Sequence, residues 1–434
     1  MWIHRVWIAA ALLLIAAIAR GQTPTGHVTM TADYLPNRSG TGEIRARVFA
    51  EEVLDPTPRL LLTLSGFAEG LLARRPAAAP FAPDARVNIR DAVVRVHEAS
   101  VSYQTERFDV LTGFTRVVWG RLDELQPSDV INPIDVSRFL FEGRSHARLP
   151  VGVVRVRAHL TEGASLEGVY VPFFRRGRFD ELAERTSPFN LEPTPPSVDA
   201  CLAGGCPSLL PISVERRTPA ATLGSGQGGA RFNATVGRVD WSVSAYRGLE
   251  PFGLARFAPL PPQAAIAPVH VVFPRFTMIG GDFETVRGNW GLRGEIAAFV
   301  VGSFQHPSVR IVEGRSFDAG VGVDRTAGQY RVSGTVLLHR ESYDEPIDGT
   351  RRRSDLSLIA STDRRFARER YEVRTFGVFN AKERSGFLRG ITTAKLRDDL
   401  ALEGSIGWFA GSGPSAIGRF SESDFAYVRL KYFF

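Results

Sequence analysis

From about residue 26 to the end of the chain, polar and apolar side chains alternate at every second position in one segment after another. Each segment is roughly 9 to 14 residues long, the length of strands that cross a membrane at a tilt. One such segment sets Ile44, Ala46, Val48 and Ala50 against Glu43, Arg45, Arg47, Phe49 and Glu51. This pattern suits a barrel wall with one lipid-facing and one wet face, although a soluble β-sandwich shows similar alternation.

The links between these segments separate the two architectures. Short links near residues 55–58, 104–106, 162–164, 238, 287–289, 326–328, 368–370 and 397–399 alternate with longer ones near 72–89, 119–151, 174–228, 249–270, 302–315, 341–353 and 410–422. Residues 36–42 and 382–385 are short exceptions on the long-link side. Membrane barrels combine short periplasmic turns with longer extracellular loops. We therefore predict an all-β fold, a transmembrane up-and-down antiparallel β-barrel of about 18 strands, with 16 as the alternative.

The first residues predict export. Arg5 precedes an apolar run over residues 6–19, and Ala17-Ile18-Ala19 offers the small side chains that a signal peptidase accepts. About 14 apolar residues are too few for a membrane helix, which needs about 20. No later run is long enough for a spanning helix either. We expect a signal peptide over residues 1–21, a barrel over 22–434, and a place in the outer membrane of a Gram-negative cell.

The last segment carries the clearest alternation. Its apolar face consists of Ala426, Val428, Leu430, Tyr432 and Phe434, and its other face of Tyr427, Arg429 and Lys431. A strand that ends in Phe resembles the signal read by the bacterial barrel-insertion machinery. The expected partners are that machinery, through Phe434, together with outer-membrane lipid and lipopolysaccharide.

The formal charge of +7 is carried almost wholly by arginine. An exported chain rarely meets nucleic acid, so anionic solutes or lipid phosphates are the expected partners of this charge. The alternate strand positions that we expect to face the lumen include these basic residues: Arg45, Arg47, Arg95, Arg155, Arg157, Arg331, Arg374, Arg429 and Lys431. Rings of Arg and Lys favour anions in a pore. Alternatively, these residues pair with carboxylates across neighbouring strands and only hold the barrel in register.

The two cysteines, Cys201 and Cys206, lie in Cys-Leu-Ala-Gly-Gly-Cys. Export places them in an oxidising environment, and the two glycines let a short ring close. We expect a disulfide within a loop and no metal site, because no further ligands with suitable spacing accompany the pair.

The segment over residues 119–150 is rich in Ile, Leu and Phe, which is unusual for a surface loop. Such a loop hides its apolar side chains by folding inward, so we predict a constriction or plug inside the lumen. The candidate constriction residues are Trp119, Asp123, Asp129, Asn132, Asp135, Arg138, Glu142 and Arg144. Asn132-Pro133 favours a turn, Asp129 and Asp135 suit turn backbones, and the arginines offer them charged partners. The acidic spacing does not match a calcium loop.

The pattern Trp119-Gly120-x-x-Asp123-x-x-x-Pro127-x-Asp129-x-x-Asn132-Pro133-x-Asp135 continues into Phe141-Glu142-Gly143-Arg144 and then into the segment 171–180. It resembles an uncharacterised porin-like family of bacterial outer-membrane proteins, distantly similar to alginate-export channels. The resemblance covers residues 100 to 190 and implies a monomeric barrel with an internal loop. It implies no particular solute.

The sequence predicts no enzyme and no cofactor, since it contains no Gly-x-Ser-x-Gly, and His97 and Ser102 have opposite parity. The expected function is a channel for diffusion of small anionic or organic solutes. The alternative is a non-conducting or gated barrel that serves as an envelope scaffold or as the outer partner of another transport system. Uptake of hydrophobic solutes is a third possibility, suggested by Phe139, Leu140 and Phe141.

Overall fold

A computed structural model describes residues 24–37, 41–76, 86–190, 212–258, 267–411, 415 and 417–434. The predicted signal peptide, the cysteine pair and residues 191–211 of the 174–228 segment lie outside the described residues, and the predictions made for them stay predictions.

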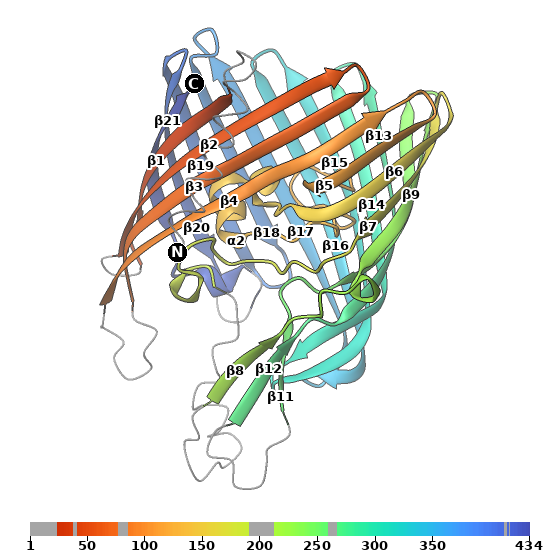
Figure 1. The fold of residues 1–434 in the computed structure, drawn as a ribbon. Coiled ribbons are helices and arrows are strands. Elements are labelled where there is room, and N and C mark those ends of the chain that lie inside the picture. Colours follow the sequence, from red (N-terminus) through yellow and green to blue (C-terminus); the bar gives the residue numbers. More distant parts are fainter. Residues whose placement is uncertain are drawn as a thin grey trace.

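The fold is one closed sheet of 18 antiparallel strands (Figure 1). Each barrel strand pairs with the next along the chain, and β1 closes the ring by pairing with β21. The barrel strands are β1 (Thr25–Leu35), β2 (Thr41–Thr57), β3 (Leu60–Pro76), β4 (Arg86–Gln104), β5 (Phe108–Thr115), β6 (Val151–Thr161), β7 (Ala164–Val171), β9 (Gln227–Val236), β10 (Val239–Leu249), β13 (Arg275–Arg287), β14 (Trp290–His306), β15 (Arg310–Ala327), β16 (Tyr330–Ile347), β17 (Thr350–Phe366), β18 (Tyr371–Asn380), β19 (Ser385–Arg397), β20 (Leu400–Ala410) and β21 (Phe425–Phe433). The predicted barrel of about 18 strands is confirmed, and the alternative of 16 is wrong.

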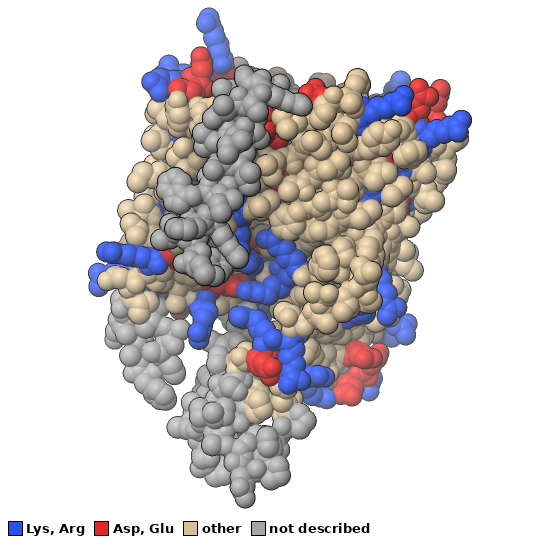
Figure 2. Space-filling model, in the orientation of Figure 1, with Lys and Arg blue, Asp and Glu red and all other residues tan. Residues whose placement is uncertain are grey.

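The strand parity follows the predicted alternation. In β21, Val428 and Leu430 point outward and are exposed, whereas Tyr427 points inward and is buried. On the part of the outer surface that is visible in Figure 2, charged side chains gather towards the two ends of the barrel, and the wall between them is mostly uncharged. This is the distribution that lipid contact requires of a barrel wall.

The two ends of the barrel differ in their links. At one end, here called the tight-turn end, every short link predicted from the sequence is a turn; Gly237 and Gly328 adopt the left-handed backbone that such turns need. At the other, the long-loop end, the predicted loops over 302–315 and 341–353 are wrong. There β14 to β17 run on to turns at residues 307–309 and 348–349. Val309 and Asp348 adopt positive φ in these turns. The polar residues before and after each turn are paired between the neighbouring strands.

A second, three-stranded sheet projects from the long-loop end (Figure 1). Its strands are β8 (Ile212–Arg217), β11 (Leu254–Phe257) and β12 (Ala267–Val272); β12 pairs with β8 in parallel and with β11 antiparallel. Val269, Val271 and Phe273 form its apolar core with Ala255 and Val309. Single 3-10 turns occur at η1 (Glu184–Thr186), η2 (Leu223–Ser225) and η3 (Gly418–Phe420).

The segment between β5 and β6 folds into the barrel, as predicted. It contains two short helices, α2 (Val136–Glu142) and α3 (Arg144–Ala147), and Figure 1 shows α2 inside the ring of strands. Within the described part of the chain, no helix has the length and apolar character needed to cross a membrane.

Candidate functional site

The candidate site is the narrowed lumen, formed by residues 116–150, here called the inner loop, and the wall around it. Asn132 closes the neck of this loop: its Oδ1 accepts a hydrogen bond from Val117 N, and its Nδ2 donates to Leu149 O, both at 2.9 Å. Asp135 caps α2 by accepting from Arg138 N at 3.0 Å. The loop therefore has an internal structure of its own.

Asp129 holds the middle of the inner loop together. Its Oδ2 lies 2.7 Å from Arg148 Nε and 3.1 Å from Arg144. Because both guanidinium groups come from α3 and the residue after it, this carboxylate joins the two halves of the loop. Within the described residues, no group of three or more His, Cys, Asp or Glu side chains is arranged to hold a metal ion.

The carboxylate of Glu295 on β14 fastens the first part of the inner loop to the wall. Its Oε1 accepts from the backbone N and hydroxyl of Ser128, both at 2.7 Å. Its Oε2 accepts from Arg121 N at 3.0 Å and Leu122 N at 3.2 Å. Glu295 is only 2% exposed, and four hydrogen bonds from the loop satisfy it. Sequence reasoning missed this residue, because nothing in a single strand shows which inward carboxylate meets a distant loop.

Packing and charge add to this attachment. Trp119 is buried, donates to Glu167 Oε1 at 2.8 Å and meets the ring of Tyr246 edge-on. Leu122 packs against Gly320 of β15, where an added Cβ would lie 2.6 Å from Leu122 Cδ1. Asp123 lies 3.0 Å from Arg293 on β14. Strands β7, β10, β14 and β15 thus hold the start of the loop.

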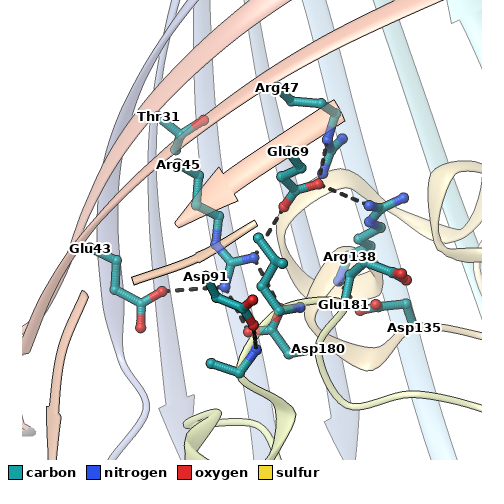
Figure 3. Close-up of polar contacts among 12 residues, drawn as sticks. Thr31, Glu43, Arg45, Arg47, Glu69, Asp91, Asp135, Arg138, Asp180 and Glu181 are labelled. Atoms are coloured by element: carbon teal, nitrogen blue, oxygen red, sulfur yellow. Dashed lines mark hydrogen bonds and ion pairs between the residues drawn. The ribbon is translucent and has the colours of Figure 1, made fainter. Parts of the chain in front are cut away.

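The helix α2 is fastened to the opposite wall by charge. Glu69 of β3 accepts from Arg47, Arg45 and Arg138 at 2.8, 3.3 and 3.0 Å, and Figure 3 shows these side chains converging on it. Glu142 lies 2.9 Å from Arg47 and 3.8 Å from Arg429. Burial alone would raise the pKa of Glu142, but the guanidinium groups of Arg47 and Arg429 hold it well below its usual range.

An aromatic cluster covers the other side of α2. Arg389 of β19 donates to Leu140 O at 3.0 Å and to Phe141 O at 2.8 Å. The ring of Phe141 lies 4.6 Å from that of Phe425, centroid to centroid. The cluster also contains Leu35, Phe189, Phe387, Phe409, Phe420 and Tyr427. The apolar residues that suggested hydrophobic uptake are therefore packed against the wall and against one another.

A second segment, residues 172–190, also lies against the inner face, although the sequence assigned its residues from 174 onward to a long extracellular loop. Asp180 accepts two hydrogen bonds from Arg45, at 2.6 and 3.0 Å (Figure 3), and one from Arg75 at 3.1 Å. Arg178 exchanges backbone hydrogen bonds with Ile134 and Val136 of the inner loop. One sequence signal could have predicted that this segment folds inward: the apolar Phe179 and Leu182 flank two acidic residues, and such apolar side chains are usually buried.

Burial would raise the pKa of Asp180, but the charge and hydrogen bonds of Arg45, followed by Arg75, lower it. Asp135 behaves differently: burial raises its pKa to about 7, and the nearby Arg138 offsets only part of that effect. One oxygen of Asp135, Oδ2, has no hydrogen-bond partner within the structure. The pKa values of Asp135 and Asp180 are thus shifted in opposite directions, because only Asp180 has guanidinium groups in direct contact with its carboxylate.

The predicted basic residues lie on the inward face of their strands, and carboxylates accompany almost all of them. The pairs within 4.0 Å are Arg45 with Glu43, Glu69 and Asp180; Arg47 with Glu69 and Glu142; Arg95 with Glu181; Arg155 and Arg157 with Glu167; Arg331 with Asp123 and Asp324; Arg374 with Glu124 and Asp363; and Arg429 with Glu142 and Glu403. Lys431 instead lies over the ring of Phe433. The basic residues alone therefore overstate the positive charge of the lumen, because Glu69, Glu167, Glu295 and Asp282 also lie buried on the inward side of the wall.

The inner loop leaves open space beside it. A cavity of about 910 Å³ lies between the loop and the wall formed by β15 to β18, and it reaches turn residues at the tight-turn end. Its charged lining comprises Arg144, Arg148, Arg331, Arg365, Arg368, Arg374, Asp123, Glu124, Glu142, Asp363, Glu369 and Glu372. A second cavity of about 630 Å³ lies beside residues 120–123 and carries more basic than acidic groups. Under α2 the space shrinks to about 30 Å³, enough for about one water molecule.

No protein-family model matches this chain, and no curated protein matches it in sequence. The resemblance to alginate-export channels therefore stays a prediction. Among solved structures, OccAB4 of Acinetobacter baumannii is similar over 95% of this chain and 98% of its own, with 9% identity and a TM-score of 0.50. The outer membrane protein OpdK of Pseudomonas aeruginosa is similar over 95% and 99%, with 10% identity and a TM-score of 0.50.

An anion-selective porin of Comamonas acidovorans covers 95% of this chain and 99% of its own, with 12% identity and a TM-score of 0.42. At such identities the likeness concerns the fold alone. The chain has the fold of a porin-like outer-membrane β-barrel, a closed 18-stranded antiparallel ring with a loop folded into its lumen.

Proposed function

We propose that this protein is a porin-like channel of the Gram-negative outer membrane, through which small organic solutes diffuse. The observation that carries the proposal is the cavity of about 910 Å³ between the inner loop and β15 to β18. Most of the loop's contacts are with other strands, and beside β15 to β18 the loop leaves this part of the lumen unfilled. A lumen that is narrowed on one side and open on the other suits selective diffusion.

The charge of the lining refines the expected solute. Six arginines and six carboxylates line the larger cavity, so its wall is nearly balanced. The basic excess at the second cavity favours anions there. We therefore expect passage of small charged or zwitterionic organic solutes, with a preference for anions that is weaker than the inward arginines alone would give.

Planar-bilayer recording of purified, refolded protein tests this proposal. We expect steady single-channel conductance from the full-length chain and a larger conductance from a variant that lacks residues 119–145. A salt gradient then gives the reversal potential, from which a weak anion preference is expected. A strong preference for cations would refute the charge argument, and the absence of any conductance from the folded full-length protein would refute the channel.

A second function is favoured by how firmly the inner loop is held. Its residues contact β2, β3, β7, β14, β18 and β19, through partners such as Glu69, Glu295 and Arg389. If these contacts close the lumen permanently, the protein is a scaffold or the outer partner of another transport system. A full-length protein that stays closed, with a conducting variant lacking residues 119–145, would select this alternative.

The outer-membrane location and the partners belong to the same proposal. The backbone of Phe434 pairs with Gly26 in both directions, at 3.0 and 3.1 Å, so the end of β21 is built into the closed ring. Recognition of Phe434 by the insertion machinery would precede this pairing. Deletion of Phe434 should therefore lower the amount of heat-modifiable, folded barrel in the membrane fraction without changing export.

A further inference from the structure

Three arginines form a cluster on the outer face of β15, β16 and β17 towards the long-loop end. The strand register sets Arg315 opposite Ser342, and Ser342 opposite Arg352, so the two arginines flank one serine in a single row. Arg340 faces Phe317 on one side and Ser354 on the other. It is therefore the diagonal neighbour of both Arg315 and Arg352, at roughly 7 to 8 Å between Cα atoms.

All three side chains are exposed, and they point away from the lumen. The alternation along each strand shows this orientation. Gly320 and Gly322, at even positions of β15, face the inner loop, so the odd position of Arg315 faces outward. Leu338 of β16 and Leu356 of β17 have the same parity as Arg340 and Arg352, and they are 40% and 38% exposed. Within the described ranges, none of the three guanidinium groups forms an ion pair. The nearest outward acid on β15, Glu313, lies two residues further towards the loop end. An unpaired group of three like charges on adjacent strands is unfavourable unless an anion joins it.

The cluster lies at one edge of the apolar belt. Below it, Val321, Val336 and Leu358 are exposed and apolar. At the other edge, Arg325 lies over the ring of Trp290 and Arg364 over that of Tyr330, both at 4.9 Å. Ten residues separate Arg315 from Arg325, which is roughly 34 Å along the strand and roughly 25 Å across the membrane at the usual tilt. This equals the height of a membrane barrel's apolar band.

We propose that Arg315, Arg340 and Arg352 form a binding site for the phosphate groups of a phosphorylated glycolipid, the lipid A headgroup of lipopolysaccharide in the outer leaflet. Extracellular loops are the longer ones, so the long-loop end faces the outer leaflet. Guanidinium groups bind phosphate oxygens through paired hydrogen bonds, and Ser342 and Ser354 add hydroxyl donors between them. Phe317 and the leucine row lie where acyl chains would begin. The inference rests on the proposed outer-membrane location, not on conduction.

Binding to full-length protein, refolded from denaturant and free of native lipid, tests the site. Native mass spectrometry in detergent measures the affinity for diphosphoryl lipid A, monophosphoryl lipid A, phosphatidylglycerol and inorganic phosphate. We expect diphosphoryl lipid A to bind most tightly. Each arginine near a charged membrane surface contributes about fivefold to affinity, so the variant R315Q/R340Q/R352Q should lose on the order of 100-fold.

The matched control is R325Q/R364Q, which removes two outward arginines at the opposite edge of the belt and should leave lipid A binding unchanged. Heat-modifiable migration on gels shows that each variant is folded. The proposal is overturned if the triple variant binds lipid A as the wild type does, if the control loses binding equally, or if inorganic phosphate competes at the same affinity. Conductance in phospholipid bilayers is measured separately. A triple variant that conducts but has lost lipid A leaves both proposals standing, whereas a folded protein that binds lipid A without conducting refutes only the channel.

Discussion

Replacement of Glu295 by alanine should detach the first part of the inner loop from the barrel wall. The substitution removes the acceptor of three backbone N–H groups and one hydroxyl. Two of those N–H groups belong to Leu122 and Ser128, which are both buried. A buried donor left without a partner costs about 1 to 3 kcal/mol, so the attached state should lose about 2 to 6 kcal/mol. At the lower end, the detached state would become about 30 times more populated.

Two measurements report this change. Single-channel recordings should show frequent excursions to higher conductance, and limited trypsin digestion of the folded barrel should cut after Arg121 much faster than in the wild type. Glu284→Ala is the matched control, because Glu284 also meets Arg121 but is partly exposed and makes side-chain ion pairs only. Such pairs contribute at most about 1 kcal/mol. Unchanged conductance noise together with unchanged cleavage in Glu295→Ala would refute the idea that this carboxylate fastens the loop.

Three further outcomes are expected. Asp180→Asn leaves Arg45 and Arg75 with Glu43 as their one shared carboxylate, which should destabilise the folded barrel by about 1 to 3 kcal/mol in a urea titration. A change below the error of the titration would contradict this ion-pair network. Because the folded pKa of Asp135 is raised to about 7, its protonated form is favoured in the fold, so loop attachment should weaken as pH rises from about 4 towards about 7. Asp135→Asn keeps the helix cap and should flatten the pH dependence of trypsin cleavage, and a wild type with no such dependence would refute the assignment. Arg374→Gln removes the partner of Glu124 at the larger cavity and should move the reversal potential towards cation preference, whereas a shift towards anions would contradict the proposed lining.

The fold was predictable because a barrel repeats one simple constraint along the chain. Alternation with period two fixes which side chains face lipid, and link lengths fix the direction of each strand. Both signals are local, so β21 and the turn near Gly237 could be placed from their own residues. The sequence predicts loops near residues 302–315 and 341–353, where the structure has strands, because a strand that extends beyond the membrane needs no apolar face and its sequence then resembles that of a loop.

The site was less predictable because its contacts are distant in sequence. The apolar content of residues 119–150 indicates an inward loop. No local signal, however, shows that Ser128 in this loop binds Glu295, which lies 167 residues further along the chain. Sequence parity also marked the inward arginines without showing their partners. Asp180 and Glu142 belong to the loop segments and reach the wall only after these fold into the lumen. Counting one charge sign along strands therefore overstated the positive character of the lumen.

The pairing of β1 with β21 sets the order in which this molecule can mature. His27 faces Phe433, so the ring closes only after nearly the whole chain has been synthesised. Until then, the edges of the growing sheet expose unpaired backbone groups that invite aggregation. Contacts between residues so far apart in sequence form slowly. For the outer-membrane location proposed above, survival of the chain in the periplasm would depend on helper proteins that shield those edges, and a cell short of such helpers should lose this protein before it loses proteins with local folds.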